Sequence, residues 1–308
     1  MFEKMNIIKM GIMPTKKESK EYVKQGIIPV KFCYPKIGGD IWHKLRRDKR
    51  YVIGERELTA FNGSLDNVKE IIEEDPINIV HLGPGDGIEV PLLFDRLNLC
   101  GNGKYVGADI SGKMIINTFR LNKPYFSNDN SLWYLTDIEI EGNLELICRD
   151  IKNKGANRNL ILLTNQGVLL SNPRILEFMQ KSMDNQDYLF ITVEGDCPPK
   201  RDEICATYDL AEVRELLSVG LQRAGYDPKK GRFRTVLNEQ ESRAEVYFKP
   251  EMVQSGSMHN KPEILCLTSY KPQTDEFRQR LENAGLHIKF MKFYEDVHTF
   301  GVLCSKNR

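Results

Sequence analysis

The fold is predicted by one stretch of the sequence, Ile79-Val80-His81-Leu82-Gly83-Pro84-Gly85-Asp86-Gly87. The apolar run from Ile77 to Leu82 is typical of a buried parallel strand, and a helix is expected from about Ile88 to Leu97. The glycines between them let the backbone turn sharply and let a ligand approach without a Cβ in the way. Open α/β sheets bind nucleotides at the carboxyl end of such a strand. The turn is therefore a candidate ligand-binding loop, with a plain strand-to-helix turn as the alternative.

Strands and helices alternate on both sides of this turn. An amphipathic helix is expected over residues 64–74, and Ser111 caps a second one that should reach Leu121. The further strands are expected at Tyr105–Ala108, Leu132–Leu135, Leu160–Leu163 and Tyr188–Val193. Strands that alternate with helices predict a parallel, doubly wound, Rossmann-like α/β sheet, to which Thr299–Cys304 would add a final antiparallel strand.

The alternation pauses in the second half of the chain, which suggests an insertion. A long helical stretch around Leu210–Ala224 is followed by apolar/polar alternation through Ala244–Phe248, and the α/β pattern resumes at Ile264. The predicted organisation has four regions: an N-terminal helical substrate-capping segment (1–62), a ligand-binding core (63–198), an inserted substrate or lid region (199–262) and a C-terminal return to the core sheet (263–308).

Composition excludes several classes of protein. Lys and Arg total 44 and Asp and Glu total 43, so the net charge of +1 lacks the basic excess of a nucleic-acid binder. The N-terminal stretch is too polar for a secretory signal, and no apolar run reaches the roughly 18–20 residues of a membrane span. The 7 cysteines form no Cys-x-x-Cys pair, and the 5 histidines show no metal-ligand spacing. We therefore expect a cytoplasmic protein without disulfides or a bound metal.

Acidic residues near the glycine turn indicate which nucleotide-like ligand it binds. Asp109 ends the second strand, where a carboxylate accepts hydrogen bonds from a ribose diol in NAD or in S-adenosylmethionine (SAM). Asp86 lies inside the turn and would repel a pyrophosphate, and the third glycine comes one residue earlier than in the dinucleotide pattern. SAM carries an ammonium and a sulfonium and no phosphate, so the turn favours SAM.

The adenine amino group needs an acceptor at the end of the third strand. Asp137 is the preferred residue and Asp150, in a predicted helix, is the rival. His81 lies inside the first strand, where the alternative to a cofactor contact is a packed, hydrogen-bonded core residue. The complete predicted cofactor site comprises His81, Gly83, Pro84, Gly85, Asp86, Asp109, Ile110 and Asp137.

With these motifs the sequence resembles the histidine-specific SAM-dependent methyltransferase family. The resemblance rests mainly on Leu82–Gly87 and Tyr105–Ser111 and extends loosely from about residue 30 to the C-terminus. It implies a class I SAM methyltransferase fold, a substrate domain built from the N-terminal segment and the insert, and methylation of the α-amine of an amino acid. Ala206-Thr207-Tyr208-Asp209 and Thr268-Ser269-Tyr270-Lys271 resemble the family's Ala-x-Tyr-Asp and Ser-x-Lys segments, whose tyrosine and serine contact the substrate.

Two departures concern the family's substrate, histidine. Leu267 stands where the family has the glutamate that holds the imidazole, and Leu169 stands where it has an asparagine that grips the amino acid. Gln166 or Asn165 can substitute for that asparagine. A site built for a polar side chain loses affinity sharply when its partner is missing, so these residues argue against free histidine.

The remaining candidates belong to the acceptor site. Glu194 follows the fifth strand and can hold an ammonium or take its proton, or be a solvated loop acid. Tyr208 is the second catalytic candidate and can instead pack its ring on a helix face. Tyr34, Tyr51 and Trp42 can form an aromatic lid over the cations, or be core. The predicted substrate-binding residues are Tyr34, Tyr51, Gln166, Tyr208 and Ser269.

Together these observations predict a SAM-dependent N-methyltransferase that acts on the amine of an amino acid, an amino-acid-derived small molecule or a peptide. Such a reaction needs no nucleophilic side chain, which agrees with the absence of any triad motif. The alternatives are a SAM-dependent O-methyl or aminocarboxypropyl transferase and a non-catalytic protein of the same fold. Near-zero net charge disfavours a nucleic-acid methyltransferase, and Asp86 disfavours an NAD oxidoreductase.

Overall fold

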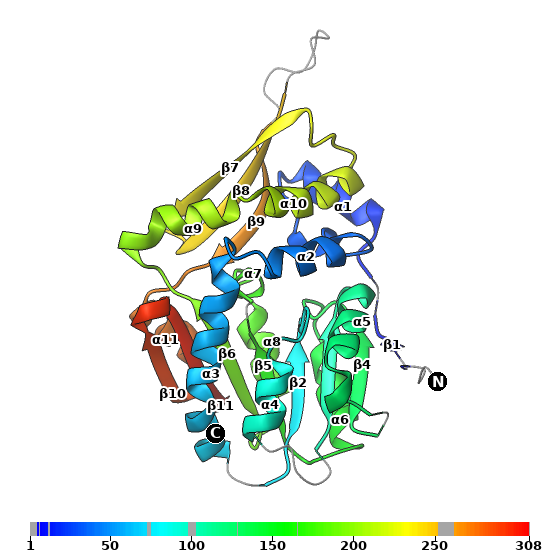
Figure 1. The fold of residues 1–308 in the computed structure, drawn as a ribbon, viewed down its shortest axis with the longest axis vertical. Helices are drawn as coiled ribbons and strands as arrows, with labels where there is room; N and C mark the ends of the chain where they lie inside the picture. The colour runs from blue at the N-terminus through cyan, green and yellow to red at the C-terminus, as the bar shows by residue number, and fades with distance from the viewer. Residues whose placement is uncertain are drawn as a thin grey trace.

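A computed structural model describes residues 5, 7–11, 13–72, 75–97, 103–127, 129–164, 166–251 and 262–307. It contains one 8-stranded sheet and one 3-stranded sheet (Figure 1). In spatial order the strands of the large sheet are β1 (Ile7–Lys9), β4 (Ser131–Leu135), β3 (Tyr105–Asp109), β2 (Asn78–Leu82), β5 (Asn159–Leu163), β6 (Tyr188–Glu194), β11 (Thr299–Lys306) and β10 (Leu286–Tyr294).

The core of the large sheet is parallel, as the alternation of strands and helices predicted. The pairings β4–β3, β3–β2, β2–β5 and β5–β6 are all parallel, and β11 inserts antiparallel between β6 and β10. Strands β2, β3 and β5 are buried at every residue, which is why they read as continuous apolar runs. This is the α/β class I SAM methyltransferase fold that the resemblance implied.

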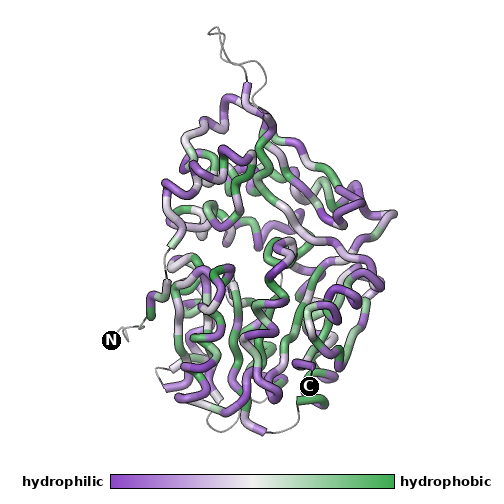
Figure 2. Tube along the Cα trace, turned by 180° about the vertical axis from the view of Figure 1, so that it is seen from behind, coloured by the Kyte–Doolittle hydropathy of each residue, from purple (hydrophilic) through white to green (hydrophobic). Residues whose placement is uncertain are grey.

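Helices cover both faces of the large sheet. One face packs against α3 (Val52–Ile72), α4 (Val90–Leu97) and α5 (Gly112–Leu121). The other face packs against α6 (Asn143–Lys152), α7 (Gly167–Leu170), α8 (Ile175–Ser182) and α11 (Thr274–Asn283). Figure 2 shows the resulting pattern, with hydrophobic strands in the middle and hydrophilic residues on the outer helices. Short 3₁₀ turns connect elements at η2 (Lys123–Tyr125), η3 (Pro198–Lys200) and η4 (Glu295–Val297).

A second unit, here called the cap, lies beyond the carboxyl edge of the large sheet (Figure 1). Its sheet has the antiparallel order β7 (Gly231–Asn238), β8 (Arg243–Pro250) and β9 (Ile264–Tyr270). The cap helices are α1 (Lys16–Lys24), η1 (Val30–Phe32), α2 (Gly38–Arg46), α9 (Arg201–Tyr208) and α10 (Ala211–Ala224). The cap has an apolar cluster of its own, built from segments far apart in sequence, such as Phe32, Leu217 and Phe248.

Three elements differ from the sequence prediction. The helix expected over 64–74 begins at Val52, so the boundary proposed between 62 and 63 falls inside one continuous helix. Strand β9 pairs with β8 in the cap and not with the core sheet, because an apolar run of this length fits either environment. The N-terminal region also contributes β1, which pairs in parallel with β4 at the edge of the large sheet.

The close packing of β3 against β4 gives a prediction for stability. A Cβ added at Gly107 would lie 2.5 Å from Cζ3 of the buried Trp133 ring. Such overpacking costs roughly 1–3 kcal/mol, so Gly107→Ala should lower the free energy of unfolding by about that amount in urea denaturation.

The matched control for this substitution is Gly112→Ala at the start of α5. A Cβ there meets only Leu135, at 3.9 Å, an ordinary contact. It should leave stability unchanged or raise it slightly, because alanine favours helix over glycine. Equal unfolding midpoints for the two variants would contradict the packing argument.

Candidate active site

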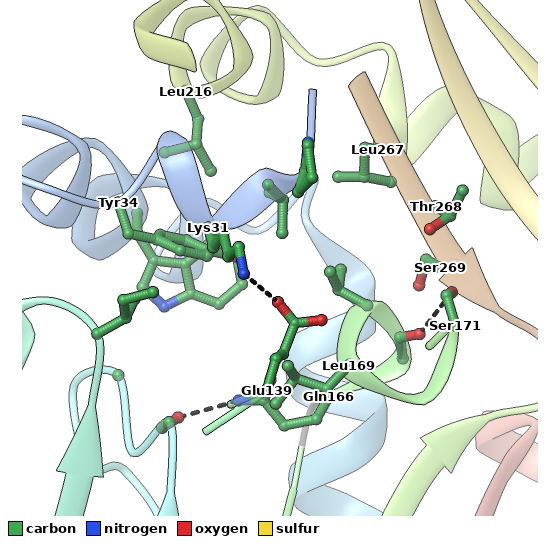
Figure 3. A pocket seen from close by; sticks show the side chains of 18 of the residues that line it. Lys31, Tyr34, Glu139, Gln166, Leu169, Ser171, Leu216, Leu267, Thr268 and Ser269 are labelled. Atoms are coloured by element: carbon green, nitrogen blue, oxygen red, sulfur yellow. Dashed lines mark hydrogen bonds and ion pairs between the residues drawn. The ribbon is translucent and has the colours of Figure 1, made fainter. Parts of the chain in front are cut away.

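A cavity of about 260 Å³ lies between the carboxyl edge of the large sheet and the cap. On the sheet side it is lined by the ends of β2, β3 and β4, at Gly83, Asp109 and Asp137. On the cap side it is lined by α10 and β9, and Figure 3 shows Leu216 and Leu267 from these elements facing the same space. The cavity therefore lies at the switch point of the sheet, where open α/β folds bind their ligands.

The glycine turn after β2 forms one side of this cavity. Gly83, Gly85 and Gly87 all have positive φ angles, of +62°, +60° and +67°, which residues with a Cβ rarely adopt. A Cβ at Gly83 would lie 2.4 Å from Nε2 of Gln166, whose amide donates a hydrogen bond to the Gly83 carbonyl oxygen at 3.1 Å. The turn is thus a cradle of backbone groups, held in place by Gln166, which caps α7 after β5.

Asp109 ends β3 beside this cradle and is 4% exposed. Its Oδ1 accepts a hydrogen bond from the backbone amide of Ser111 at 2.8 Å. Burial raises the pKa of Asp109 to about 7, although hydrogen bonds from the backbone amides of Ser111, Gly85 and Ile110 favour the carboxylate. Ile110 also lines the cavity. The predicted ribose acceptor is therefore held rigidly at the cavity wall.

Asp137 lies at the end of β4 and also lines the cavity. Its Oδ2 is 2.9 Å from Nζ of Lys31, which is also 3.4 Å from Oε2 of Glu139 (Figure 3). The rival candidate Asp150 lies on α6, where it accepts a hydrogen bond from Tyr134 and is 2.6 Å from Nζ of Lys154. The geometry brings Asp137 to the site, whereas Asp150 is engaged elsewhere.

Three predicted cofactor residues stay outside the cavity wall: His81, Pro84 and Asp86. The His81 ring lies 3.0 Å from the Tyr105 hydroxyl and 3.1 Å from Oγ1 of Thr164, and burial lowers its pKa to about 3. It is the neutral core residue that the alternative interpretation described. Asp86 is 7% exposed and has Oδ2 4.0 Å from Nδ1 of His43 on α2, so it faces the cap helix and not the cavity.

The acceptor side of the cavity contains the predicted aromatic and hydroxyl residues. Trp42 packs edge-on against both Tyr34 and Tyr51, with ring centroids 6.1 and 5.8 Å apart. Tyr208 at the end of α9 and Ser269 on β9 line the same cavity. The structure thus brings together Tyr34, Tyr51, Gln166, Tyr208 and Ser269, whereas Asn165 lies outside the described residues.

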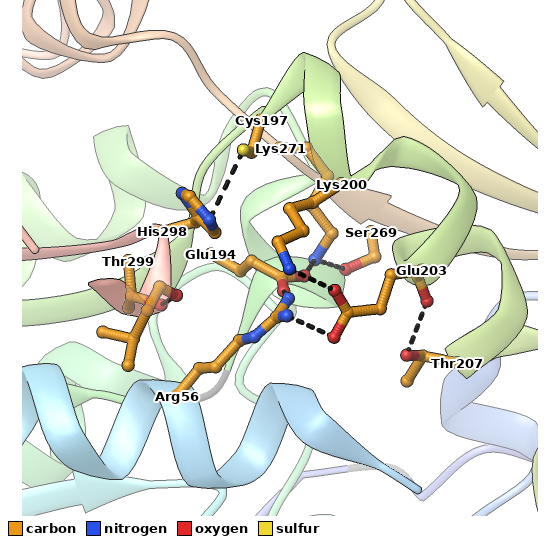
Figure 4. A network of polar contacts seen from close by, with 11 residues as sticks. Arg56, Glu194, Cys197, Lys200, Glu203, Thr207, Ser269, Lys271, His298 and Thr299 are labelled. Carbon is orange, nitrogen blue, oxygen red and sulfur yellow. Dashed lines mark hydrogen bonds and ion pairs between the residues drawn. The ribbon is translucent and has the colours of Figure 1, made fainter. Parts of the chain in front are cut away.

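Glu194, predicted to be catalytic, does not line the cavity. It is fully buried, with Oε1 2.8 Å from Arg56 and Oε2 2.9 Å from Nζ of Lys271. Arg56 reaches onward to Glu203 at 2.6 Å, so an alternating network of charges joins α3, β6 and α9 (Figure 4). Glu194 is therefore paired with two cations and lies outside the cavity wall.

Lys271 is the innermost cation of this network and contacts Ser269, a residue of the cavity wall. It is 1% exposed and donates a hydrogen bond to Oγ of Ser269 at 3.2 Å. Its Nζ also lies 5.4 Å from the centroid of the Tyr208 ring. The pKa of Lys271 is raised by Glu194 despite burial, so the ammonium stays charged.

Sequence reasoning missed four charged residues of the site: Lys31, Glu57, Glu139 and Lys271. For Glu57 a signal was available, because it sits on the apolar face of α3 between Ile53 and Ala60. Lys31 and Glu139 belong to segments that meet only through the tertiary fold.

Within the described ranges, no helix is long and apolar enough to cross a membrane, and no cluster of three or more His, Cys, Asp or Glu could hold a metal.

Comparison with known proteins gives a family match over nearly the whole chain. The model of the family described as "Histidine-specific methyltransferase, SAM-dependent" matches residues 15–306. A search of curated proteins found no matching relative.

Several solved structures are similar to the chain at low identity. A SAM-dependent methyltransferase from Clostridium acetobutylicum ATCC 824 is 10% identical, with 81% of this chain and 92% of that chain covered and a TM-score of 0.46. The CcbJ methyltransferase from Streptomyces caelestis is 10% identical, with 82% and 90% covered and a TM-score of 0.46. Magnesium protoporphyrin IX methyltransferase from Synechocystis PCC 6803, with bound SAH, is 11% identical, with 95% and 99% covered and a TM-score of 0.46.

The position of Asp109 gives a prediction for cofactor binding. Asp109→Ala should weaken the binding of S-adenosylhomocysteine at least tenfold, because a hydrogen bond to a charged group contributes about 1.5–3 kcal/mol. Calorimetric titration measures this directly. Asp150→Ala is the matched control and should bind with unchanged affinity, since Asp150 is paired on α6. Unchanged binding by Asp109→Ala would rule out the assigned ribose site.

Proposed function

The chain belongs to the family of histidine-specific, SAM-dependent methyltransferases, and from this premise we propose that it methylates the amine of an amino acid, an amino-acid-derived small molecule or a peptide. SAM-dependent methyltransferase activity follows from the family itself. One observation carries the finer proposal: a single cavity joins the glycine cradle and Asp109 to a wall that contains Tyr208 and Ser269. A methyl donor and an amine would meet within that one enclosed space.

The residues of the sheet-side wall fit SAM. A Cβ at Gly83 would displace the Gln166 side chain that packs on the cradle, and carboxylates of Asp109 and Asp137 stand at the neighbouring strand ends. When bound, SAM supplies an electrophilic methyl group on a sulfonium. We assign the ribose hydroxyls to Asp109 and the adenine amino group to Asp137, where it would replace the Lys31 ammonium at Oδ2. The backbone of Gly83 and Gly85 would contact the rest of the ligand.

The chain's own contribution to methyl transfer is to position the amine and exclude water. When the reacting groups are held in near-attack geometry, the activation barrier falls by a large amount without any covalent help from the protein. The edge-packed rings of Tyr34, Trp42 and Tyr51 present aromatic surface that attracts a cation. These rings and the buried hydroxyl of Tyr208 support an acceptor site for a positively charged amine.

The buried lysine supports an acceptor that also carries a carboxylate. Lys271 donates to Oγ of Ser269, and the Ser269 hydroxyl also lies within hydrogen-bonding reach of Tyr208. The Tyr208 hydroxyl is on the same wall, and Lys271 lies within its reach. Two hydroxyls backed by an ammonium suit the α-carboxylate of an amino acid.

The side-chain end of the acceptor site is apolar, which supports a substrate other than free histidine. Leu267 and Leu169 both line the cavity, at the positions where the family has its glutamate and asparagine. Val213 and Leu216 from α10 extend this surface, and with Leu267 they belong to the apolar cluster of the cap. An imidazole placed there would give up hydrogen bonds with water and gain few in return, whereas an apolar side chain would not.

The test is a methylation assay with SAM and each of the twenty amino acids, read by mass spectrometry. We expect the mass gain of one methyl group on an amino acid with an apolar side chain, with histidine a poorer acceptor. Mild alkaline hydrolysis of the product would leave the methyl group in place if it is on the amine and would release it as methanol if it is an ester. Transfer of the aminocarboxypropyl group would show as a larger mass gain and would overturn the proposal, as would the absence of any product.

Leu267→Glu tests how the acceptor site selects its side chain. The new carboxylate should raise the efficiency of methylation of histidine relative to the preferred apolar acceptor, because it restores a hydrogen-bonding partner for the imidazole. The measurement is the ratio of kcat/KM for the two acceptors. Leu267→Met conserves volume and should keep the original preference. A ratio unaffected by both substitutions would mean that position 267 does not contact the acceptor.

A further inference from the structure

Glu57 is a buried acid in the cavity wall that forms no ion pair with any residue that the structure describes. It lies on α3, on the helix face that packs against the large sheet, and is 2% exposed. Its side chain lines the cavity together with those of Tyr51 and Tyr208. A carboxyl group is costly to bury, and Glu57 offsets part of that cost with hydrogen bonds from Thr192 and from the backbone of Glu194, not with an ion pair.

The groups around Glu57 come from β6, from the segment after β9, and from the end of α2 and the turn before α3. Oε2 accepts a hydrogen bond from Oγ1 of Thr192 on β6 at 3.3 Å. The charged groups that act on Glu57 are Lys271 after β9, Glu194 at the end of β6 and Arg46 on α2, and Tyr51 lies beside it.

Both neighbouring cations already have partners. Lys271 is 2.9 Å from Glu194, and Arg46 is 3.4 Å from Glu89. Across the described residues neither cation forms an ion pair with Glu57. Its carboxyl group is therefore the acid of the acceptor wall that is left for a ligand's cation.

We propose that Glu57 binds the acceptor ammonium and takes the proton that the amine must lose before it can be methylated. This inference rests on the proposed function, since it assumes an amine acceptor. An ammonium has no lone pair, so one proton has to leave the nitrogen before a bond to carbon can form. Among the cavity acids, Asp109 is held by backbone amides at the cofactor side, and Asp137 and Glu139 are engaged by Lys31.

The proton and electron pairs balance in this step. The ammonium gives one proton to the Glu57 carboxylate, and the freed lone pair forms the new N–C bond. The S–C bond of SAM breaks, and its electron pair stays on sulfur as a neutral thioether. The product is a methylammonium, and Glu57 passes its proton to solvent when the product leaves. Repetition on the same nitrogen would need a second SAM and a second proton loss by the same route.

The acidity of Glu57 matches this role. Burial raises its pKa to about 8, with Lys271 opposing the shift and Glu194 adding to it. The α-amino group of a peptide titrates at about 8, so the proton can move between the two with little bias, whereas the more basic amine of a free amino acid gives up its proton less readily. An ordinary carboxyl would hold the proton several thousandfold less well. General bases work best when their pKa lies near that of the group they deprotonate and near the working pH.

The first test compares the pH–rate profiles of the wild type and Glu57→Gln. The variant should lose about 10²–10⁴-fold in kcat/KM near neutral pH. That loss should shrink as pH rises, because the amine then arrives already deprotonated. Glu55→Gln is the matched control, since Glu55 is exposed on the same helix, and its profile should follow the wild type. A loss that is the same at every pH would show a merely structural role and overturn the inference.

The second test needs no turnover. The best acceptor of the amino-acid panel is titrated into each protein, loaded with S-adenosylhomocysteine, in buffers of different ionisation enthalpy. Near pH 7 free Glu57 is protonated, so binding an ammonium should release about one proton in the wild type and none in Glu57→Gln. Equal proton release by both proteins would contradict the inference.

The outcomes separate the two proposals. If the wild type methylates no amine, the proposed function fails and the proton acceptor fails with it. If the wild type methylates an amine and Glu57→Gln matches it at every pH, only the inference fails. Folding of the variant should not obscure the result. Between pH 4.5 and about 8 the native state holds a proton on Glu57 that the unfolded state has released. The free energy of unfolding therefore falls as pH rises through that window, and Glu57→Gln removes this decrease.

Discussion

The parallel strands of the large sheet all end at the same edge, and the chemistry of this protein depends on that constraint. Gly83 follows β2, Asp109 ends β3, Asp137 follows β4 and Gln166 follows β5, so residues far apart in sequence share one wall. Nothing in the individual segments requires them to meet. They meet because right-handed crossover connections make neighbouring strands of such a sheet run in the same direction. The cap then needs only to close the open side.

Buried charge organises the opposite wall. The ladder of Glu203, Arg56, Glu194 and Lys271 alternates in sign from the edge of α9 inward to β9 (Figure 4). Burying such charges stabilises the fold little, because desolvation offsets most of the attraction. The network instead fixes a position: the Lys271 ammonium is held against Ser269 by Glu194, whereas an unpaired lysine side chain would turn toward water. The acceptor wall thereby gains polarity without leaving an uncompensated charge in the interior.

Local pattern predicted the parts of the site that lie at strand ends. The turn at Gly83, Asp109 and the preference for Asp137 over Asp150 followed from strand and helix periodicity, and all three residues line the cavity. The same reasoning chose Glu194, because position after a strand does not reveal whether a neighbouring helix supplies cations. Glu57 carried the opposite signal, a charge on an apolar helix face, and was passed over. His81 shows the same limit, since both of its ring nitrogens face core partners contributed by other strands.

The unbroken course of α3 has a consequence for substrate range. One helix begins beside the aromatic residues of the cap at Tyr51, places Glu57 in the cavity and ends against the core at Ile72. Bending it near residue 62 would break several i→i−4 hydrogen bonds, so the cap and the base of the sheet keep a fixed spacing on this side. The distance from Glu57 to the cofactor side of the cavity is thus fixed by one helix. Amines that differ in length by a single methylene would then be methylated at different rates, because only one length places the nitrogen at the methyl group. This selection is independent of how well their side chains suit the apolar wall.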